Sequence, residues 1–286
     1  MQNAGMLALG LDWRYLAFNV HPDDLEEAIQ GAQQMRFVGL NLTVPHKRLA
    51  LDLVDSLDAS AEEWGAVNTI RFEGLDSQGA WVPMGHPDAD AFRELRSVGF
   101  NTDADAILRA CQEELKTVFS QLEVLLVGVG GAGRVAALKL ASAGVKRLHL
   151  MNRTISRAEG VQAEIKARYP SCRVEVGYPQ VEVDLLVNGT SVGLNPSDPL
   201  PLDLDKVRFS RDASVYDMIY QPAETRLLAQ ARAAGCRVAN GLGMLLYQGA
   251  RALEIWTEGE VPVGAMREAL ESHIYGRTEG KRKGSS

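Results

Sequence analysis

The sequence predicts an α/β protein of two domains, and three observations lead to this prediction. The length of 286 residues is typical of two domains. Short apolar runs alternate with amphipathic helical stretches along most of the chain, a pattern that favours parallel strands joined by helices. A glycine cluster near the middle of the chain joins one apolar run to a helical stretch and marks the start of the second domain.

The composition is that of an ordinary globular protein. Apolar residues make up 46% and charged residues 23%, and the net charge of −7 argues against a nucleic-acid-binding surface. The basic cluster Lys281–Lys283 lies in a tail, 276–286, that we expect to be disordered. No apolar run reaches 18 residues and no leader opens the chain, so we expect a cytoplasmic protein without a membrane partner. The three cysteines, Cys111, Cys172 and Cys236, have no metal-binding spacing, so we expect buried thiols and no metal.

Five elements alternate at the start of the predicted first domain, residues 1–104. Proline, glycine and acidic first-turn residues mark the ends of its helices, and the alternation favours parallel strands. Residues 71–99, rich in glycine and proline, are expected to form an irregular insertion on a hairpin with a short helix at 88–97. The five expected elements are a helix over 3–10, a strand over 14–20, a helix over 21–34, a strand over 37–44 and a helix over 45–55.

Polar side chains gather where the second of these strands ends. Asn41 and Thr43 share one face because side-chain direction repeats every second residue, and Lys47 begins the next helix. Open α/β sheets bind ligands at the carboxyl ends of strands. We expect Asp103 to meet Lys47 across the cleft between the domains and to hold its ammonium group. The alternatives are a solvated lysine and, for 101–103, a helix N-cap.

The predicted second domain, 105–257, is built around the glycine loop. The apolar run 122–127 enters the loop, and the helical stretch 134–143 leaves it. Glycines permit a tight turn and a close approach to a pyrophosphate, and the helix N-terminus offers unpaired N–H groups. The order of strand, loop and helix therefore predicts a Rossmann-type dinucleotide-binding domain. The residues expected at the phosphates are Gly128, Gly130, Gly131, Ala132 and Gly133.

The end of the next strand, 147–151, predicts which dinucleotide binds. Asn152-Arg153-Thr154 and then Arg157 stand where an NAD-binding chain usually has an acidic residue. A guanidinium group binds phosphate in a bidentate way, so we expect a 2′-phosphate and hence NADP. The alternative for Arg157 is a solvated residue in the first turn of a helix.

The sequence predicts four further strands in the second domain, over 173–177, 183–187, 215–219 and 236–239. We expect the last three to end beside the nicotinamide half of the cofactor. The residues expected at this edge are Asn188, Met218, Tyr220, Gly241 and Met244. Gln248 shares a helical face with Met244, and its spacing fits a surface amide as well as a substrate ligand. We expect the last helix, within 258–275, to pack back on the first domain.

Six motifs in the same order resemble the shikimate dehydrogenase family and cover most of the chain. They are Asn-Leu-Thr-Val-Pro-His-Lys at 41–47, Ala-Val-Asn-Thr at 66–69, Asn-Thr-Asp at 101–103, the glycine loop, Asn-Arg-Thr-x-x-Arg at 152–157, and Asn-Gly-Leu-Gly-Met at 240–244 with Gln248. The resemblance implies reduction of 3-dehydroshikimate to shikimate with NADPH and a catalytic pair of Lys47 and Asp103. It implies substrate contacts from Asn41, Thr43, Asn68, Tyr220 and Gln248.

The chain departs from the family pattern in two places. The family's first strand and its Ser-x-Ser loop for the substrate carboxylate would precede Met1, so we expect an incomplete first domain. We therefore expect the chain to bind NADP normally and shikimate poorly. Residues 71–99 replace a short hairpin turn. A quinate or other polyol-acid dehydrogenase, and an NADP-binding protein with impaired catalysis, stay open as alternatives. The substrate is the expected partner, and a homodimer stays open as an oligomeric state.

Overall fold

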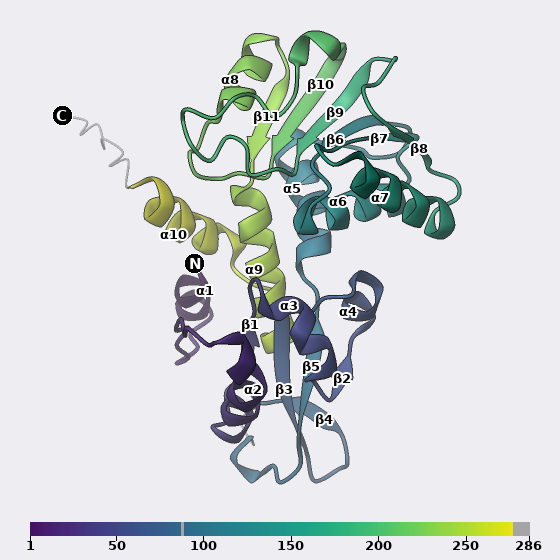
Figure 1. Ribbon diagram of the computed structural model, residues 1–286. Coiled ribbons are helices and arrows are strands. Elements are labelled where there is room, and N and C mark those ends of the chain that lie inside the picture. The colour runs from purple at the N-terminus through teal and green to yellow at the C-terminus, as the bar shows by residue number, and fades with distance from the viewer. Residues whose placement is uncertain (87–88, 277–286) are drawn as a thin grey trace, which may run out of the picture. The chain divides into compact units, whose positions relative to one another are not determined.

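The computed structural model describes residues 1–86 and 89–276, and the chain divides into two compact units (Figure 1). Unit 1 comprises Met1–Asp103 and Leu246–Ser286, and unit 2 comprises Ala104–Leu245. Most of the tail expected at 276–286, with its basic cluster, lies outside the described residues. None of the helices in the described part of the chain is both long and apolar enough to cross a membrane. All three cysteines are free and buried, as predicted.

Unit 2 is a doubly wound parallel sheet of six strands in the order β11-β10-β9-β6-β7-β8. Continuous apolar runs form its central strands because both faces of a parallel sheet are covered. Helices α6 (Gly131–Ser142) and α7 (Ile155–Arg168) lie along β6 to β8, and α8 (Arg226–Ala233) packs on β10 and β11 (Figure 1). The strands are β6 (Glu123–Val127), β7 (Arg147–Met151), β8 (Arg173–Val176), β9 (Val183–Asn188), β10 (Phe209–Asp217) and β11 (Arg237–Asn240).

The register of this sheet brings five strand ends into one row. Val127 of β6 is paired with Met151 of β7 on one side and with Asn188 of β9 on the other. Asp217 of β10 is paired with Asn188 and with Asn240 of β11. The residues that directly follow these five are Asn152, Gly128, Gly189, Met218 and Gly241. Four of them are residues that the sequence analysis assigned to the cofactor, so parallel pairing places them along one edge.

Unit 1 contains a five-stranded mixed sheet in the order β1-β3-β5-β2, with β4 beside β3. Only the pairing of β2 with β5 is parallel among the described strands, so the expectation of a parallel sheet is wrong for this unit. Strand β3 pairs antiparallel with β1, β4 and β5, and antiparallel neighbours need no helix-linked crossover between them. The strands are β1 (Gly39–Asn41), β2 (Ser56–Leu57), β3 (Thr69–Leu75), β4 (Trp81–Pro83) and β5 (Leu95–Phe100).

The expected helices differ most from the structure after residue 45 and in the described part of 88–97. The helix expected over 45–55 is shorter and continues as a 3₁₀ turn. The elements before β2 are α1 (Gln2–Ala8), η1 (Pro22–Asp24), α2 (Leu25–Gln34), α3 (His46–Leu49) and η2 (Ala50–Asp52). The later helical elements not yet given are α4 (Ala59–Trp64), η3 (Ala89–Ala91), α5 (Asp103–Leu115), η4 (Leu204–Lys206), α9 (Leu242–Thr257) and α10 (Val263–Tyr275).

The strand expected over 14–20 is absent, since this stretch pairs with no other strand of the described chain. The side chain of Asn3 instead makes hydrogen bonds to the backbone of Tyr15 of the kind that a neighbouring strand would make. Its Oδ1 accepts a hydrogen bond from the Tyr15 amide at 2.7 Å, and its Nδ2 donates to the Tyr15 carbonyl at 3.0 Å. An alternating pattern needs a ladder partner to become a strand, and here a side-chain amide satisfies the backbone instead.

The described residues of 71–99 contribute three strands to the sheet, so the expectation of an irregular insertion is wrong for these parts. They supply most of β3, all of β4 and most of β5. The helix expected at 88–97 is wrong over its described part, where β5 begins at Leu95. Phe92 packs directly on Gly74, because a Cβ at that glycine would lie 2.1 Å from the Phe92 ring. The apolar spacing that resembled a helix stripe therefore comes from a core contact with β3.

The second half of α9 belongs to unit 1, whereas the sequence placed the boundary near residue 257. Two contacts explain the difference. Trp256 Nε1 donates to the carbonyl of Ile70 at 2.9 Å, and Arg71 Nη1 donates to the carbonyl of Ile255 at 3.2 Å. Helix α10 is also in unit 1, where it packs on α1, as expected for the last helix.

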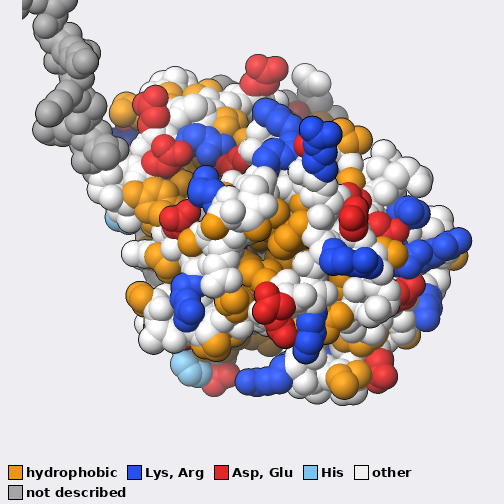
Figure 2. All heavy atoms as spheres, turned by 90° about the horizontal axis from the view of Figure 1, so that it is seen from above, with side chains coloured by type: hydrophobic (Ala, Val, Ile, Leu, Met, Phe, Trp, Pro, Cys, Tyr) orange, Lys and Arg blue, Asp and Glu red, His pale blue; other side chains and the backbone are white. Residues whose placement is uncertain are grey.

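Acidic and basic side chains are interspersed on the face shown in Figure 2. A charged cluster around the buried His149 lies in the sheet of unit 2. His149 is 1% exposed, with its ring nitrogens 3.5 Å from a carboxylate oxygen of Glu123 and 3.7 Å from one of Glu175, and Arg147 contacts both acids. Burial lowers the pKa of His149, although the carboxylates of Glu175 and Glu123 oppose that shift.

We predict that His149 makes the fold less stable in mild acid. Its pKa is lower in the folded protein than the unfolded value of about 6.5, so the unfolded chain binds the proton more readily and stability falls as pH drops below that value. The free energy of unfolding in urea should decrease between about pH 7.5 and about pH 5.5, and His149→Leu should reduce this decrease. An unchanged pH dependence in the variant would show that other groups cause it.

Candidate active site

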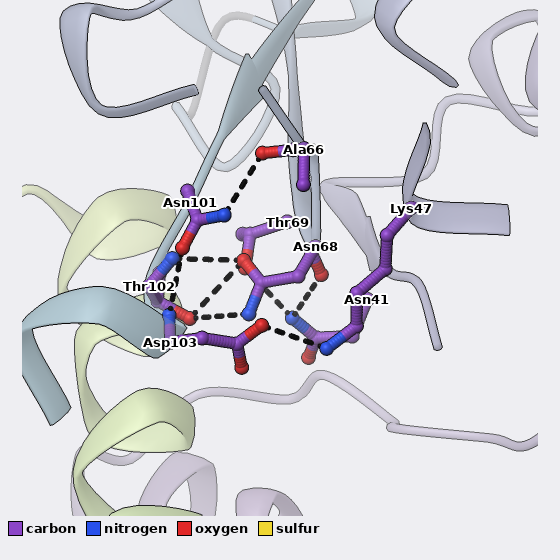
Figure 3. Close-up of polar contacts among 8 residues, drawn as sticks. All are labelled: Asn41, Lys47, Ala66, Asn68, Thr69, Asn101, Thr102 and Asp103. Atoms are coloured by element: carbon purple, nitrogen blue, oxygen red, sulfur yellow. Dashed lines mark hydrogen bonds and ion pairs between the residues drawn. The ribbon is translucent and has the colours of Figure 1, made fainter. Parts of the chain in front are cut away.

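The centre of the candidate site in unit 1 is an ion pair between Lys47 and Asp103. Lys47 Nζ lies 2.7 Å from Asp103 Oδ2, and the two side chains are 26% and 22% exposed (Figure 3). Both residues belong to unit 1, so the ion pair does not span a cleft between the domains as we expected from the sequence. The pair is accessible to a ligand, and the carboxylate restricts the position of the ammonium group.

Backbone hydrogen bonds determine where Lys47 stands. The carbonyl of Lys47 accepts from the amide of Val67 at 2.7 Å, which ties α3 to the segment before β3. The next amide, that of Asn68, donates to the carbonyl of Phe100 at 3.0 Å. The helix that carries the lysine is therefore joined to the two central strands of the sheet.

Asp103 is held by the residues that precede it. Its amide donates to Asn101 Oδ1 at 3.1 Å, so the helix-capping alternative for 101–103 describes part of the geometry. Asn101 Nδ2 donates to the carbonyl of Ala66 at 2.9 Å, and the Thr102 amide donates to Asn68 Oδ1 at 2.8 Å (Figure 3). The same short segment, 66–68, thus bonds to the backbone of Lys47 and to the two residues that precede Asp103.

Asn68 is 2% exposed and lies at the centre of this network. Its Nδ2 donates to Thr102 Oγ1 at 3.0 Å, and its Oδ1 also accepts from Thr69 Oγ1 at 3.2 Å (Figure 3). Thr69 in turn accepts from Asn41 Nδ2 at 3.0 Å. Hydrogen bonds therefore connect the side chains of Asn41, Thr69, Asn68 and Thr102 into one network beside Asp103. Asn68 has a structural role as well as its expected role as a substrate ligand.

Tyr15 joins the network, although no motif in the sequence pointed to it. Its hydroxyl donates to Asn41 Oδ1 at 3.0 Å. Burial raises the pKa of Tyr15, which keeps the phenol protonated as a donor. Because Asn41 Nδ2 donates to Thr69 and to the carbonyl of Asn68, both ends of the Asn41 amide are engaged.

The other residues expected at the substrate are spread over both units. Thr43 is exposed and belongs to unit 1, as does the half-buried Gln248. Tyr220 belongs to unit 2.

The glycine loop of unit 2 has two kinds of glycine. Gly128 has φ +89°, and a Cβ at Gly133 would lie 1.9 Å from the carbonyl oxygen of Gly128, so both positions require glycine. Gly130 and Gly131 face open space, with nothing within 4 Å of an added Cβ. Helix α6 begins there without a side-chain cap, so its first N–H groups are directed at a space without side chains, where a pyrophosphate fits.

Among the residues after β7, Asn152 has a structural role, and Arg153 and Arg157 are available to bind a ligand. Asn152 Oδ1 accepts from the Val129 amide at 3.2 Å, and Asn152 Nδ2 donates to the carbonyl of Thr154 at 2.9 Å. Asn152 therefore ties the glycine loop to the start of α7. Arg153 and Arg157 are exposed, and neither forms an ion pair with any described residue. Their guanidinium groups fit a 2′-phosphate.

The ends of β9, β10 and β11 are packed closely. Asn188 is fully buried, and its side chain bonds to Asp217, Thr190 and the Val192 carbonyl. The sequence analysis assigned Asn188 to the cofactor, but its polar side-chain atoms are used within the protein.

Met218 and Gly241 are in contact across this edge, since a Cβ at Gly241 would lie 2.0 Å from the Met218 carbonyl oxygen. The Met244 amide donates to the hydroxyl of the buried Tyr216 at 3.3 Å, at the start of α9.

In the described part of the chain, no group of three or more histidine, cysteine, aspartate or glutamate side chains could hold a metal ion.

Comparisons with known proteins place this geometry in a family. Residues 1–70 match the model of the shikimate dehydrogenase substrate binding domain, 110–190 that of shikimate / quinate 5-dehydrogenase, and 241–271 that of the shikimate 5'-dehydrogenase C-terminal domain. A shikimate dehydrogenase (NADP(+)) from Methanopyrus kandleri is 39% identical over 281 residues, 96% of this chain and 90% of that protein.

Two solved structures show the same fold. One is the shikimate 5-dehydrogenase from Thermus thermophilus in complex with NADP(H) and shikimate, at TM-score 0.76 and 32% identity, covering 94% of this chain and 91% of that one. The other is a quinate dehydrogenase from Corynebacterium glutamicum in complex with NAD, at TM-score 0.77 and 29% identity, covering 95% and 92%.

We predict that Gly133→Ala damages both the fold and nucleotide binding. The new methyl group would collide with the carbonyl oxygen of Gly128, and overpacking of this kind costs about 1–3 kcal/mol. Thermal unfolding and NADP titration measure the two effects. Gly160→Ala in α7 is the matched control, because its Cβ meets nothing within 4 Å and should leave both properties unchanged or stabilise the helix slightly. Equal behaviour of the two variants would contradict the predicted collision.

Proposed function

The chain belongs to the shikimate dehydrogenase family, and on this premise we propose that it interconverts 3-dehydroshikimate and shikimate with NADP. The observation that supports this function best is the accessible pair of Lys47 and Asp103 at 2.7 Å. A ketone reductase needs a proton donor with a positive charge at the carbonyl oxygen, and the pair supplies both.

Lys47 and Asp103 divide the work of proton transfer. NADPH, when bound, supplies the hydride that converts the ketone carbon to an alcohol. Negative charge then develops on the ketone oxygen, where the Lys47 ammonium stabilises it and donates a proton. Asp103 holds one N–H of that ammonium and so directs the others, and in the reverse direction Lys47 takes the proton back.

The substrate contacts come from the network around this pair. Asn68 and Asn41 hold the site in shape through hydrogen bonds to Thr102, Thr69 and Tyr15. Asn68 and Asp103 bind ring hydroxyls, and the exposed Thr43 contacts the substrate from the segment before α3. The other proposed substrate ligands are Tyr220 and Gln248. A network that is already bonded in the free protein reduces the cost of ordering these groups on binding.

The cofactor residues lie along the row of strand ends in unit 2. Gly130, Gly131 and Ala132 offer the N-terminus of α6 to the pyrophosphate. Arg153 and Arg157 bind the 2′-phosphate, with Thr154 beside them. Asn152 and Asn188 act through the loops that they hold, and Met218, Gly241 and Met244 line the nicotinamide half. No metal takes part in this proposal.

The remaining proposals concern where the protein works and with what. The three free, buried cysteines fit a reducing cytoplasm. The net charge of −7 disfavours nucleic acid as a partner. A homodimer is the proposed oligomeric state, and light scattering coupled to size-exclusion chromatography measures the mass against 31.1 kDa for one chain.

The direct test of function is a spectrophotometric assay of NADP reduction with shikimate and, separately, with quinate. Quinate is included because a quinate dehydrogenase shares the fold. Shikimate should give the higher kcat/KM. Faster turnover of quinate would assign the enzyme to polyol-acid oxidation, and NADP binding without turnover of either compound would favour a binding protein.

We predict that Lys47→Ala removes turnover and leaves NADP affinity nearly unchanged. Loss of a general acid–base group typically costs about 10²- to 10⁴-fold in kcat. Arg48→Ala is the matched control, because Arg48 is the next residue of the same helix and is exposed. Steady-state kinetics and an NADP titration measure both variants. Wild-type kcat in Lys47→Ala would return this residue to the alternative of a solvated lysine.

We predict that Arg153 and Arg157 determine the preference for NADP. Charge-assisted hydrogen bonds contribute about 1.5–3 kcal/mol each, so the double alanine variant should bind NADP at least about tenfold more weakly and NAD almost unchanged. The double lysine variant keeps the charge without the planar fork and should lose less. Dissociation constants for both dinucleotides give the ratio. An equal loss for NADP and NAD would mean that the arginines support the fold.

A further inference from the structure

A fully buried carboxylate, Asp217, stands in the middle of the row of strand ends and has no catalytic task. Its side chain is 0% exposed and accepts three hydrogen bonds from three segments. The donors are Asn188 Nδ2 at 2.9 Å, the Ile219 amide at 3.1 Å and Thr225 Oγ1 at 2.6 Å. All three donors are neutral, so dipoles and not a counter-ion stabilise the carboxylate.

Each donor of Asp217 holds a different part of the edge. Asn188 fixes the loop after β9, because its Oδ1 accepts from the amide and the hydroxyl of Thr190 and its Nδ2 also donates to the Val192 carbonyl. Ile219 lies in the turn after β10, and Thr225 is the N-cap of α8, where its Oγ1 accepts from the Leu228 amide. One carboxylate therefore connects a loop, a turn and a helix start.

The turn after β10 carries Met218 and Tyr220, and backbone bonds hold it on both sides. The Met218 amide donates to the Asn188 carbonyl at 3.0 Å, and the Gly241 amide donates to the Ile219 carbonyl at 3.0 Å. Asp217 directly precedes this turn. Its carboxylate accepts hydrogen bonds from both Ile219 and Asn188 and so fixes the position of Ile219 relative to Asn188. A change at Asp217 would therefore move Met218 and Tyr220 together.

The phosphate side of the edge has hydrogen bonds of its own, although Gly128 also lies close to Thr190, which bonds to Asn188. The Gly128 amide donates to the Met151 carbonyl at 2.7 Å, and the Val129 amide donates to Asn152 Oδ1 at 3.2 Å. In a doubly wound sheet the cofactor lies along the carboxyl edge, with its adenosine half near β7 and β6 and its nicotinamide half beyond. The strand order β7-β6-β9-β10 therefore separates the bonds of Asp217 from those of the phosphate loop.

We propose that Asp217 is a positioning residue for the nicotinamide half of the cofactor site, acting through Asn188, Ile219 and Thr225. The proposal rests on the proposed function only in taking NADP as the cofactor. Burial raises the pKa of Asp217, although the hydrogen bonds from Thr225, Ile219 and Asn188 oppose that shift.

The test compares NADP with ADP-ribose 2′-phosphate, which has the phosphates of NADP but no nicotinamide. Asp217→Asn replaces one acceptor oxygen with an NH₂ group that must face a donor. We expect this variant to bind NADP about tenfold more weakly, to bind ADP-ribose 2′-phosphate within about twofold of the wild type, and to lower kcat by about tenfold or more. Equal weakening for both nucleotides would overturn the proposal, because a structural defect would affect both.

Asp184→Asn is the matched control within the same sheet. Asp184 also accepts a backbone hydrogen bond, from the Glu123 amide at 2.9 Å, but it lies at the start of β9 and so at the opposite edge. This variant should bind both nucleotides like the wild type, and selective loss of NADP in it would contradict the proposal. Thermal unfolding of each variant reports any general loss of stability.

A second pair of variants keeps the test decisive if Asp217→Asn fails to fold. Thr225→Ser keeps the hydroxyl that donates to Asp217 and should bind both nucleotides normally. Thr225→Val removes that bond and should weaken NADP selectively, so normal NADP binding in Thr225→Val would also overturn the proposal. The nucleotide titrations need no substrate, so an absence of shikimate oxidation by the wild type would defeat the proposed function and leave this inference standing.

Discussion

The close approach of α6 to the sheet is the constraint on which unit 2 depends. A Cβ at Gly133 would lie 1.9 Å from the Gly128 carbonyl oxygen, and one at Gly189 would lie 3.0 Å from the same oxygen. Because no side chain fits between them, the start of α6 lies directly against the ends of β6 and β9. The helix begins without a side-chain cap, so its N–H groups and the positive end of its dipole remain for a phosphate. The fold and the anion site therefore follow from the same contact.

Many polar side chains at both sites are already bonded within the protein. Asn68, Asn152 and Asn188 each connect segments that are distant in sequence, and two of the three are almost fully buried. The cationic residues behave differently, since Arg153 and Arg157 are exposed without an ion-pair partner among the described residues. The amide side chains thus hold the structure around the sites, and the guanidinium groups of Arg153 and Arg157 stay available to bind charged groups of the ligand. This division reduces the ordering cost on binding and leaves the charge-assisted bonds for the ligand.

The central strands of unit 2 could be predicted from the sequence because they are apolar runs buried on both faces and bounded by turn residues, as at Leu122 to Gly128. Unit 1 was harder. Whether 14–20 becomes a strand depends on a distant partner, and the spacing of Phe92 reflects contact with Gly74 and not a helix. The Lys47 and Asp103 pair was expected from motifs, but the sequence could not show that Tyr15 supports it. Side-chain networks between distant segments carry no local periodicity.

Three carboxylates show how surroundings separate the roles of chemically identical groups. Glu73 is 1% exposed and is neutralised by the guanidinium groups of Arg71 and Arg96. Asp217 is fully buried among neutral donors, so it can organise loops but faces no ligand. Asp103 alone among the three combines partial exposure with a lysine that is itself accessible, and a proton can leave that lysine only if its partner tolerates the change in charge. Solvent access lowers the energetic cost of that change, so the partial exposure of Lys47 and Asp103 suits the proton transfer that we propose for them.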